Sequence, residues 1–155
     1  MKFIIQKWDK DLDFSLVYDE ESYSFDSKPH HGDGFTSIMI NELQLEIDDL
    51  GKILYVWGYC PLIKHQETGN FPHGYKKASL VALFDEPLIP GVSYRLNEGH
   101  RWAIHINKEK KWVCIGNPDH QNRKLVEFYP DCVATMEGDK ILAIWLHPKK
   151  LPDCY

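Results

Sequence analysis

The strongest constraint on the fold is a strict alternation of apolar and polar side chains that runs from Glu42 to Asp48. Its apolar positions are Leu43, Leu45 and Ile47, and its polar positions are Glu42, Gln44, Glu46 and Asp48. A period of two is typical of a β-strand with one buried face and one open face. Residues 53–59 are apolar at nearly every position, which predicts a second strand covered on both faces. Residues 38–61 therefore predict a long β-hairpin with an acidic display face.

Short β-type runs continue along the chain, and no segment has the periodicity of an amphipathic helix. With 155 residues, of which 43% are apolar, the chain suits one domain with one sizeable core. We expect a mostly β fold, an antiparallel sandwich or a partly open barrel built from hairpins, with little helix. The expected strands are residues 2–8, 14–18, 36–48, 52–59, 78–84, 101–107, 111–116, 124–129, 132–137 and 140–147.

Turn signals support this hairpin arrangement. Gly51 and Gly138 each follow an acidic or apolar residue at a strand end, where a tight turn needs a positive φ. The charged residues 108–110 predict a third, exposed hairpin tip. Residues 61–77 contain Gly69, Asn70, Pro72 and Gly74, which predict a long loop able to act as a lid or binding element.

The charge of the chain is unevenly distributed. The net charge is −5, yet residues 9–49 hold two lysines against twelve acids, which gives −10 and leaves +5 for the remainder. This imbalance argues against nucleic-acid binding by the N-terminal third and favours a cationic partner, unless the acids are only solvated loop charges. The twelve acids are Asp9, Asp11, Asp13, Asp19, Glu20, Glu21, Asp26, Asp33, Glu42, Glu46, Asp48 and Asp49.

No motif indicates catalysis, so we expect neither an enzyme nor a bound cofactor or metal. The sequence has no nucleophile elbow, no phosphate-binding glycine loop and no dinucleotide fingerprint. Eight histidines lack the spacing of a metal site, although His100, His105 and His120 could meet across one hairpin. If histidines and aromatic residues line a pocket under the 61–77 loop, the alternative function is a small-ligand-binding or enzymatic β-barrel.

The N-terminal apolar run is too short for a signal peptide, and no stretch has transmembrane length. Both observations predict a cytoplasmic protein that does not bind membranes.

Cysteine and tryptophan positions add further expectations for a cytoplasmic protein. In that compartment the cysteines are expected as free thiols, with Cys114 and Cys132 buried. Trp57, Trp102, Trp112 and Trp145 are expected in the core. The expected free thiols are Cys60, Cys114, Cys132 and Cys154.

A mild alternative surface is basic. It mixes lysine and arginine with tryptophan, as single-strand and phosphate binders do, but lysines that protect a sheet edge explain it more simply. Its residues are Arg101, Trp102, Lys108, Lys110, Lys111, Trp112, Arg123 and Lys124. A structural subunit of a larger assembly is a third class of function.

The hairpin ELQLEID-turn-KILYVWGYCP, in a small acidic chain without catalytic residues, resembles the immunity proteins of bacterial contact-dependent growth inhibition and polymorphic toxin systems. The resemblance implies binding to a cognate toxin domain, commonly a basic nuclease, whose active site or substrate path is blocked. The charge distribution and two aromatic anchors predict the partner-binding residues. They are Trp8, Asp9, Asp11, Asp13, Asp19, Glu20, Glu21, Tyr23, Asp26, Glu42, Glu46, Asp48 and Asp49.

Overall fold

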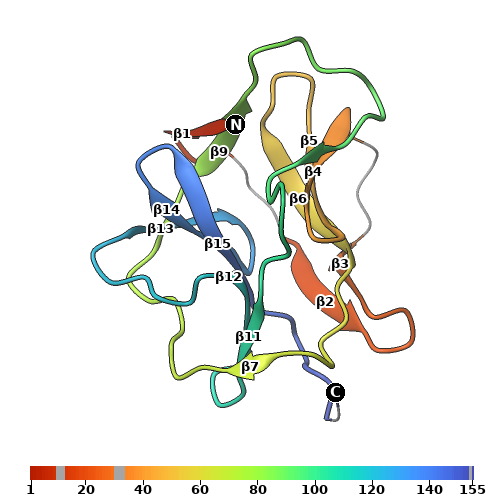
Figure 1. Ribbon diagram of the computed structural model, residues 1–155, viewed down its shortest axis with the longest axis vertical. Helices are drawn as coiled ribbons and strands as arrows, with labels where there is room; N and C mark the ends of the chain where they lie inside the picture. Colours follow the sequence, from red (N-terminus) through yellow and green to blue (C-terminus); the bar gives the residue numbers. More distant parts are fainter. Residues whose placement is uncertain (10–12, 30–33, 154) are drawn as a thin grey trace.

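The computed structural model describes residues 1–9, 13–29, 34–153 and 155, and all regular structure within them is β (Figure 1). The predicted mostly β fold is confirmed. The strands are β1 (Lys2–Gln6), β2 (Ser15–Asp19), β3 (Ser24–Lys28), β4 (Thr36–Ile40), β5 (Leu43–Ile47), β6 (Ile53–Tyr59), β7 (Gln66–Glu67), β8 (Lys76–Lys77), β9 (Ser79–Leu83), β10 (Tyr94–Arg95), β11 (Ile104–Asn107), β12 (Trp112–Gly116), β13 (Lys124–Tyr129), β14 (Cys132–Glu137) and β15 (Lys140–Leu146).

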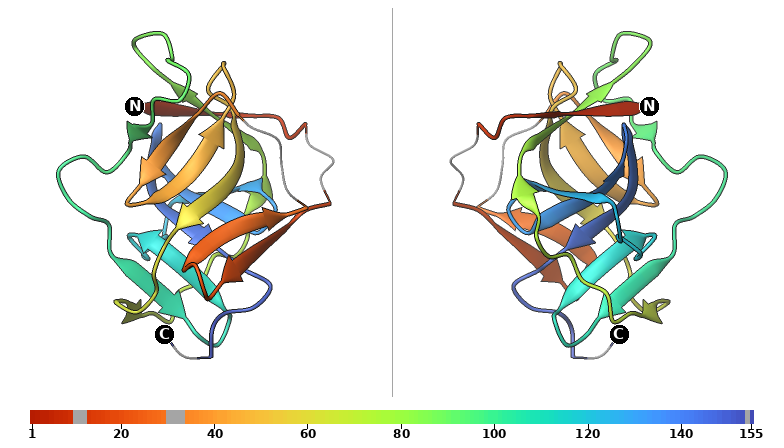
Figure 2. Two further views of the ribbon diagram at one scale, coloured as in Figure 1. Left: turned by 90° about the vertical axis from the view of Figure 1, so that its right-hand side faces the viewer. Right: turned by 90° about the vertical axis from the view of Figure 1, so that its left-hand side faces the viewer.

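Two large sheets and one small sheet make up the fold. The β2–β6 sheet has the strand order β10-β4-β5-β6-β3-β2, and the β11–β15 sheet has the order β7-β11-β12-β15-β14-β13-β8. The two lie face to face, with the β1-β9 pair near the N-terminal end of the molecule (Figure 2). Neighbouring strands are antiparallel except where the short strands β7, β8 and β10 join an edge. The described residues include no helix long and apolar enough to cross a membrane.

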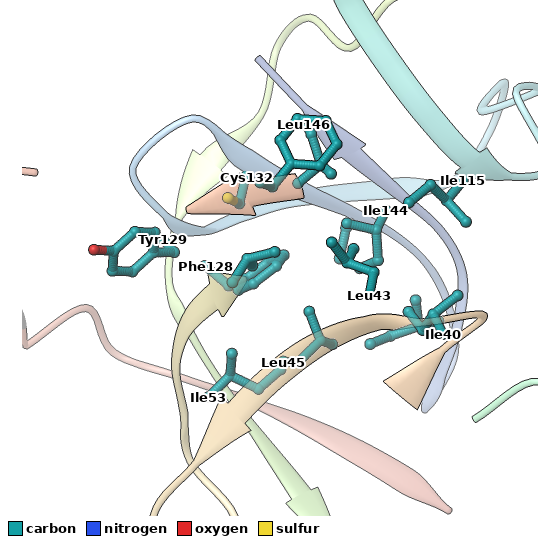
Figure 3. Close-up of a cluster of buried hydrophobic side chains, with 14 of the residues drawn as sticks. Ile40, Leu43, Leu45, Ile53, Ile115, Phe128, Tyr129, Cys132, Ile144 and Leu146 are labelled. Atoms are coloured by element: carbon teal, nitrogen blue, oxygen red, sulfur yellow. The ribbon is translucent and has the colours of Figure 1, made fainter. Parts of the chain in front are cut away.

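The core fills the space between the two large sheets. Figure 3 shows Leu43 and Leu45 of β5 on one side, facing Phe128 and Ile144 of the other sheet. These four side chains are fully buried. Each contributes roughly 1.5–3 kcal/mol relative to an exposed position. The predicted alternation of β5 is confirmed, since its burial pattern has buried residues at every second position.

The prediction of a single strand over residues 36–48 is wrong. The chain reverses at Asn41 and Glu42, and Ile40 pairs with Leu43 in an antiparallel hairpin of β4 and β5. Asn41 has a φ of 53°. This left-handed conformation is one that asparagine adopts more readily than most residues. The hairpin tips predicted at residues 108–110, at Gly51 and at Gly138 are confirmed by the strand pairs on either side of each turn.

The prediction that residues 53–59 are covered on both faces is also wrong. Trp57 is 36% exposed and Tyr59 is 48% exposed, so Trp57 is not a core residue. The physical reason is the position of the 61–77 loop, which covers the other sheet: its Phe71 and Tyr75 pack on the cluster around Trp112 and Trp145. The loop thus completes a second small core there and leaves the outer face of β6 open.

Candidate functional site: an acidic and aromatic groove

The outer face of the β2–β6 sheet forms a groove of about 800 Å³. Cross-strand pairing places its side chains on one face, because Gln44 lies opposite Trp57, and Glu46 lies opposite Tyr55. We call this hollow the acidic groove. Its charged and aromatic lining residues are Asp19, Phe25, Asp26, Lys28, Glu42, Glu46, Tyr55, Trp57 and Tyr59.

Glu46 and Trp57 form the fixed wall of the acidic groove. The indole Nε1 of Trp57 donates a hydrogen bond to Oε1 of Glu46 at 3.0 Å. The second carboxylate oxygen of Glu46 accepts a hydrogen bond from the backbone N–H of Gly34 at 3.2 Å. A Cβ on Gly34 would lie 2.6 Å from Cγ of Glu46, so only glycine allows this approach. The carboxylate therefore holds the indole in place at the groove surface.

One acid of the groove is already paired within the chain. Arg101 donates two parallel hydrogen bonds to the Glu42 carboxylate, at 2.6 and 2.9 Å. The guanidinium lowers the pKa of Glu42, so the carboxylate is ionised and largely neutralised by its partner. The negative charge open to a partner therefore comes from Asp19, Asp26 and Glu46, with Lys28 as the opposing charge in the groove.

Asp19 and Asp26 lie at the β2–β3 side of the groove. Asp19 accepts hydrogen bonds from the Ser22 hydroxyl at 2.8 Å and from the backbone N–H of Glu21 at 3.1 Å. These hydrogen bonds lower the pKa of Asp19, and the bond from Ser22 has the largest effect. Asp26 accepts a hydrogen bond from the N–H of Ser27 at 2.8 Å. The donors are neutral hydroxyl and backbone N–H groups. They hold these carboxylates in position without cancelling their negative charge.

The structure brings only part of the predicted binding surface together. Asp19, Asp26, Glu42 and Glu46 share the groove, whereas Glu20 and Tyr23 line a neighbouring hollow. Glu21 is exposed in the turn between them, and Asp13 is exposed beside β2. Asp11 lies outside the described residues.

Four predicted binding residues belong to other parts of the molecule. Asp9 forms an ion pair with Lys52 and accepts a hydrogen bond from Ser79. Asp48 accepts hydrogen bonds from two backbone N–H groups of its own turn, next to the exposed Asp49. Trp8 is half-buried, with the ammonium of Lys77 5.8 Å from its ring centroid. None of the four lines the acidic groove, and Trp8, Asp9 and Asp48 make their contacts elsewhere in the fold.

The sequence analysis missed Phe25 and Lys28 as lining residues, and it also missed three aromatic lining residues of β6, namely Tyr55, Trp57 and Tyr59. They stand at every second position of β6, which was the available signal for one aromatic face. The signal was hidden because the intervening residues are apolar too.

His100, His105 and His120 do not meet in a common site. His100 lines a hollow with Trp102, and His105 lies on β11, where burial lowers its pKa. His120 lies 5.3 Å from His73, centroid to centroid, in a hollow of about 640 Å³ beside the 61–77 loop. Among the described residues, no group of three or more His, Cys, Asp or Glu could hold a metal ion.

The described cysteines are buried free thiols, as predicted for Cys114 and Cys132. Burial raises the pKa of Cys60 to about 12, and it raises the pKa of Cys114 as well. A thiol that stays protonated is a poor nucleophile, so these side chains act as packing groups. Cys154 lies outside the described residues.

The chain matches no protein-family model, no curated protein and no solved structure. Its function is therefore inferred from the chemistry of the acidic groove.

Proposed function

We propose that this chain is an immunity protein that binds a cationic toxin domain, a nuclease, through the acidic groove and blocks its active site or substrate path. The observation that carries the proposal is the groove itself, in which carboxylates and exposed aromatic rings share one concave sheet face. A protein of this kind works by binding alone, in the cytoplasm of the cell that must be protected. It needs no cofactor and no catalytic group.

Charge supports a cationic partner. Within the described part of the chain, the carboxylates of Asp19, Asp26 and Glu46 form no salt bridge, unlike that of Glu42. A nuclease groove is positive because it must bind phosphates. A surface rich in carboxylates both steers toward such a groove and competes with the nucleic acid for it.

The exposed aromatic residues supply the affinity that charge alone does not. Tyrosine and tryptophan are the residues most enriched among interface hot spots, because they bury a large apolar area and keep a polar group for hydrogen bonding. Trp57 and Tyr59 are both exposed in the free chain and both line the groove. A partner that covers them removes apolar surface from water while its cations meet the acids.

The test combines partner capture with protection. The chain, tagged and expressed in its native host, is used to isolate bound protein, and the captured protein is then expressed alone in a sensitive strain. We expect it to arrest growth, and we expect co-expression of this chain to restore growth. The double variant Asp26→Asn, Glu46→Gln should protect poorly, because both changes remove charge while the Gln oxygen can still accept from Trp57.

The matched control is Glu137→Gln, Asp139→Asn in the β14–β15 turn, where both side chains are exposed and belong to the other sheet. This variant should protect fully. Equal protection by the two double variants, or a captured protein with no toxicity, would overturn the proposal.

A second candidate function is small-ligand binding, and one observation favours it. His73, His120, Arg123 and Phe71 line the hollow of about 640 Å³ beside the 61–77 loop. The ε2 nitrogen of His120 lies 2.9 Å from the carbonyl oxygen of Phe71, which links the two walls of the hollow. Screening a library of small metabolites by thermal shift tests this alternative, and the Arg123→Gln variant should remove any shift that a bound anion causes.

A further inference from the structure

We infer that a second hollow, next to the acidic groove, is a subsite for one arginine side chain of the partner. The hollow has a volume of about 430 Å³. We call it the tyrosine pocket. The inference rests on the proposed function, because it names one group of the same partner. Its lining includes Tyr18, Glu20, Tyr23, Tyr59, Ile63 and Tyr155.

Four tyrosines from separate parts of the chain meet here. Tyr18 belongs to β2, Tyr23 to the following turn, Tyr59 to the end of β6, and Tyr155 to the C-terminus. Tyr23 and Tyr59 are about half exposed, and Ile63 at the rim is 70% exposed. Such a concentration of exposed rings around a hollow is typical of a binding surface.

The aromatic rings suit a cation. The negative face of an aromatic ring attracts a cation within about 6 Å of its centroid, and arginine is the cation found there most often in proteins. The chain already shows this attraction at the pocket wall, since the ammonium of Lys108 lies 5.4 Å from the ring centroid of Tyr155. Lys108 is also held by Glu67 at 2.7 Å.

The polar groups of the pocket suit the same cation. The Tyr18 hydroxyl donates to the carbonyl oxygen of Cys60 at 2.8 Å, which fixes its ring. Burial, together with nearby groups that include Tyr59 and Tyr23, raises the pKa of Tyr18, so its hydroxyl stays neutral. A hydroxyl group that donates its proton in one hydrogen bond can still accept another through its oxygen. Glu20 adds a carboxylate at the rim.

Arginine fits this set of groups better than lysine does. Its planar guanidinium stacks on aromatic faces, presents five donors and is less strongly hydrated than an ammonium. It also matches a carboxylate with two parallel hydrogen bonds, a geometry that Arg101 and Glu42 already show in this chain. One guanidinium can therefore stack on a tyrosine while it binds Glu20.

Tyr59 connects the two hollows. Its ring lines both the acidic groove and the tyrosine pocket. A partner segment that places arginine in the pocket therefore brings its neighbouring cations over Asp19 and Asp26. This continuity favours a cationic segment with one preferred arginine over a diffuse positive surface.

The experiment measures peptide binding by titration calorimetry with the full chain. The probe is a lysine–glycine peptide with one central arginine, and its matched forms carry citrulline, lysine or leucine there. Citrulline keeps the shape of arginine and lacks the charge. We expect citrulline to weaken binding about tenfold, with lysine intermediate. The Tyr59→Leu and Glu20→Gln variants should lose most of this preference.

A groove variant separates this inference from the proposed function. Asp26→Asn should weaken all the peptides to a similar extent and keep the arginine preference. If Asp26→Asn weakens binding but arginine and citrulline bind equally, the pocket inference fails and the groove proposal stands. If arginine is preferred but Asp26→Asn has no effect, the groove proposal fails instead. Absence of binding by every peptide at roughly 1 mM overturns the pocket inference.

Discussion

At the scale of single residues, Gly51 shows how strongly one position depends on its surroundings. Its φ is +88°, and a Cβ there would lie 2.2 Å from the carbonyl oxygen of Ala82. Its own carbonyl oxygen accepts a hydrogen bond from the N–H of Ala82 at 2.8 Å. Gly51 therefore ends the β5–β6 turn and attaches it to β9.

We predict that Gly51→Ala lowers the free energy of unfolding by about 2–4 kcal/mol, from left-handed strain plus the clash. Gly138→Ala is the control, because Gly138 also has a positive φ but has open space around it. It should cost about 1–2 kcal/mol from the backbone alone. Urea denaturation measures both changes, and equal losses would contradict the close approach to Ala82.

Glu127 is an acid whose environment opposes ionisation. It is a buried residue on β13, and burial raises its pKa, although nearby Lys77 acts in the opposite direction. The folded-state pKa of Glu127 therefore lies above the unfolded value of 4.5. The contribution of the protonated side chain to stability is fully present below pH 4.5 and is lost as the pH rises through the folded-state pKa.

We therefore predict that Glu127→Gln raises the melting temperature at neutral pH, because glutamine removes a charge that burial disfavours. The gain over the wild type should shrink as the pH falls toward 4.5. Thermal unfolding across this pH range provides the measurement. A gain that grows in acid would mean that the Glu127 carboxylate is stabilised by the fold.

At the scale of elements, the β4–β5 turn is held by one side chain. Oδ1 of Asn41 accepts hydrogen bonds from the N–H of Trp102 at 3.0 Å and from the amide of Asn97 at 2.8 Å. The Asn41 amide donates to the carbonyl oxygen of Trp102 at 3.0 Å. The turn therefore also anchors the segment around Trp102, and this segment positions Arg101 for its ion pair with Glu42.

We predict that Asn41→Ala lowers the free energy of unfolding by about 3 kcal/mol or more, since it combines left-handed strain with unsatisfied buried groups. Asn122→Ala is the control, because Asn122 has a similar φ of 59° and is exposed. It should lose only about 1 kcal/mol. Chemical denaturation of the two variants tests the difference, and similar values would show that the Asn41 hydrogen bonds add little.

The elements differ in how far they could be predicted. The alternation in β5 and the turn glycines are local signals. The alternation predicted which face of β5 is buried, and the glycines predicted the β5–β6 and β14–β15 turns, whereas the β4–β5 turn at Asn41 was missed. β3 was missed because its inward residues include Ser27, which is buried and donates to the carbonyl oxygen of Val56. A small polar residue in that position has no apolar signature. The open face of β6 was missed because it depends on which sheet the 61–77 loop covers.

The candidate site could be predicted only as a charge excess. The excess of acids in the N-terminal third is a property of the sequence, but their partners are set by the fold. Asp9 pairs with Lys52 and Glu42 pairs with Arg101, and neither pairing has a local signal. Trp57 and Tyr59 belong to the site because the sheet places Trp57 beside Glu46 and Tyr59 opposite Ser24. This placement cannot be read from the sequence.

At the scale of the whole molecule, the two large sheets have different outer faces. The β11–β15 sheet has its outer face packed with aromatic side chains, and Phe71 of the 61–77 loop lies against Trp145 and its neighbours. The β2–β6 sheet presents the acidic groove. This asymmetry leaves the charged face of the β2–β6 sheet open, and it is the face that we propose captures a cationic protein.

The central claim, that the acidic groove binds a cationic toxin domain, is tested most directly by association kinetics. The rate constants for the captured toxin domain are measured over a range of salt concentrations, for the wild type and for Asp26→Asn, Glu46→Gln. We predict that the variant associates about tenfold more slowly at low salt and shows a weaker salt dependence. The same association rate and salt dependence in both proteins would contradict the claim.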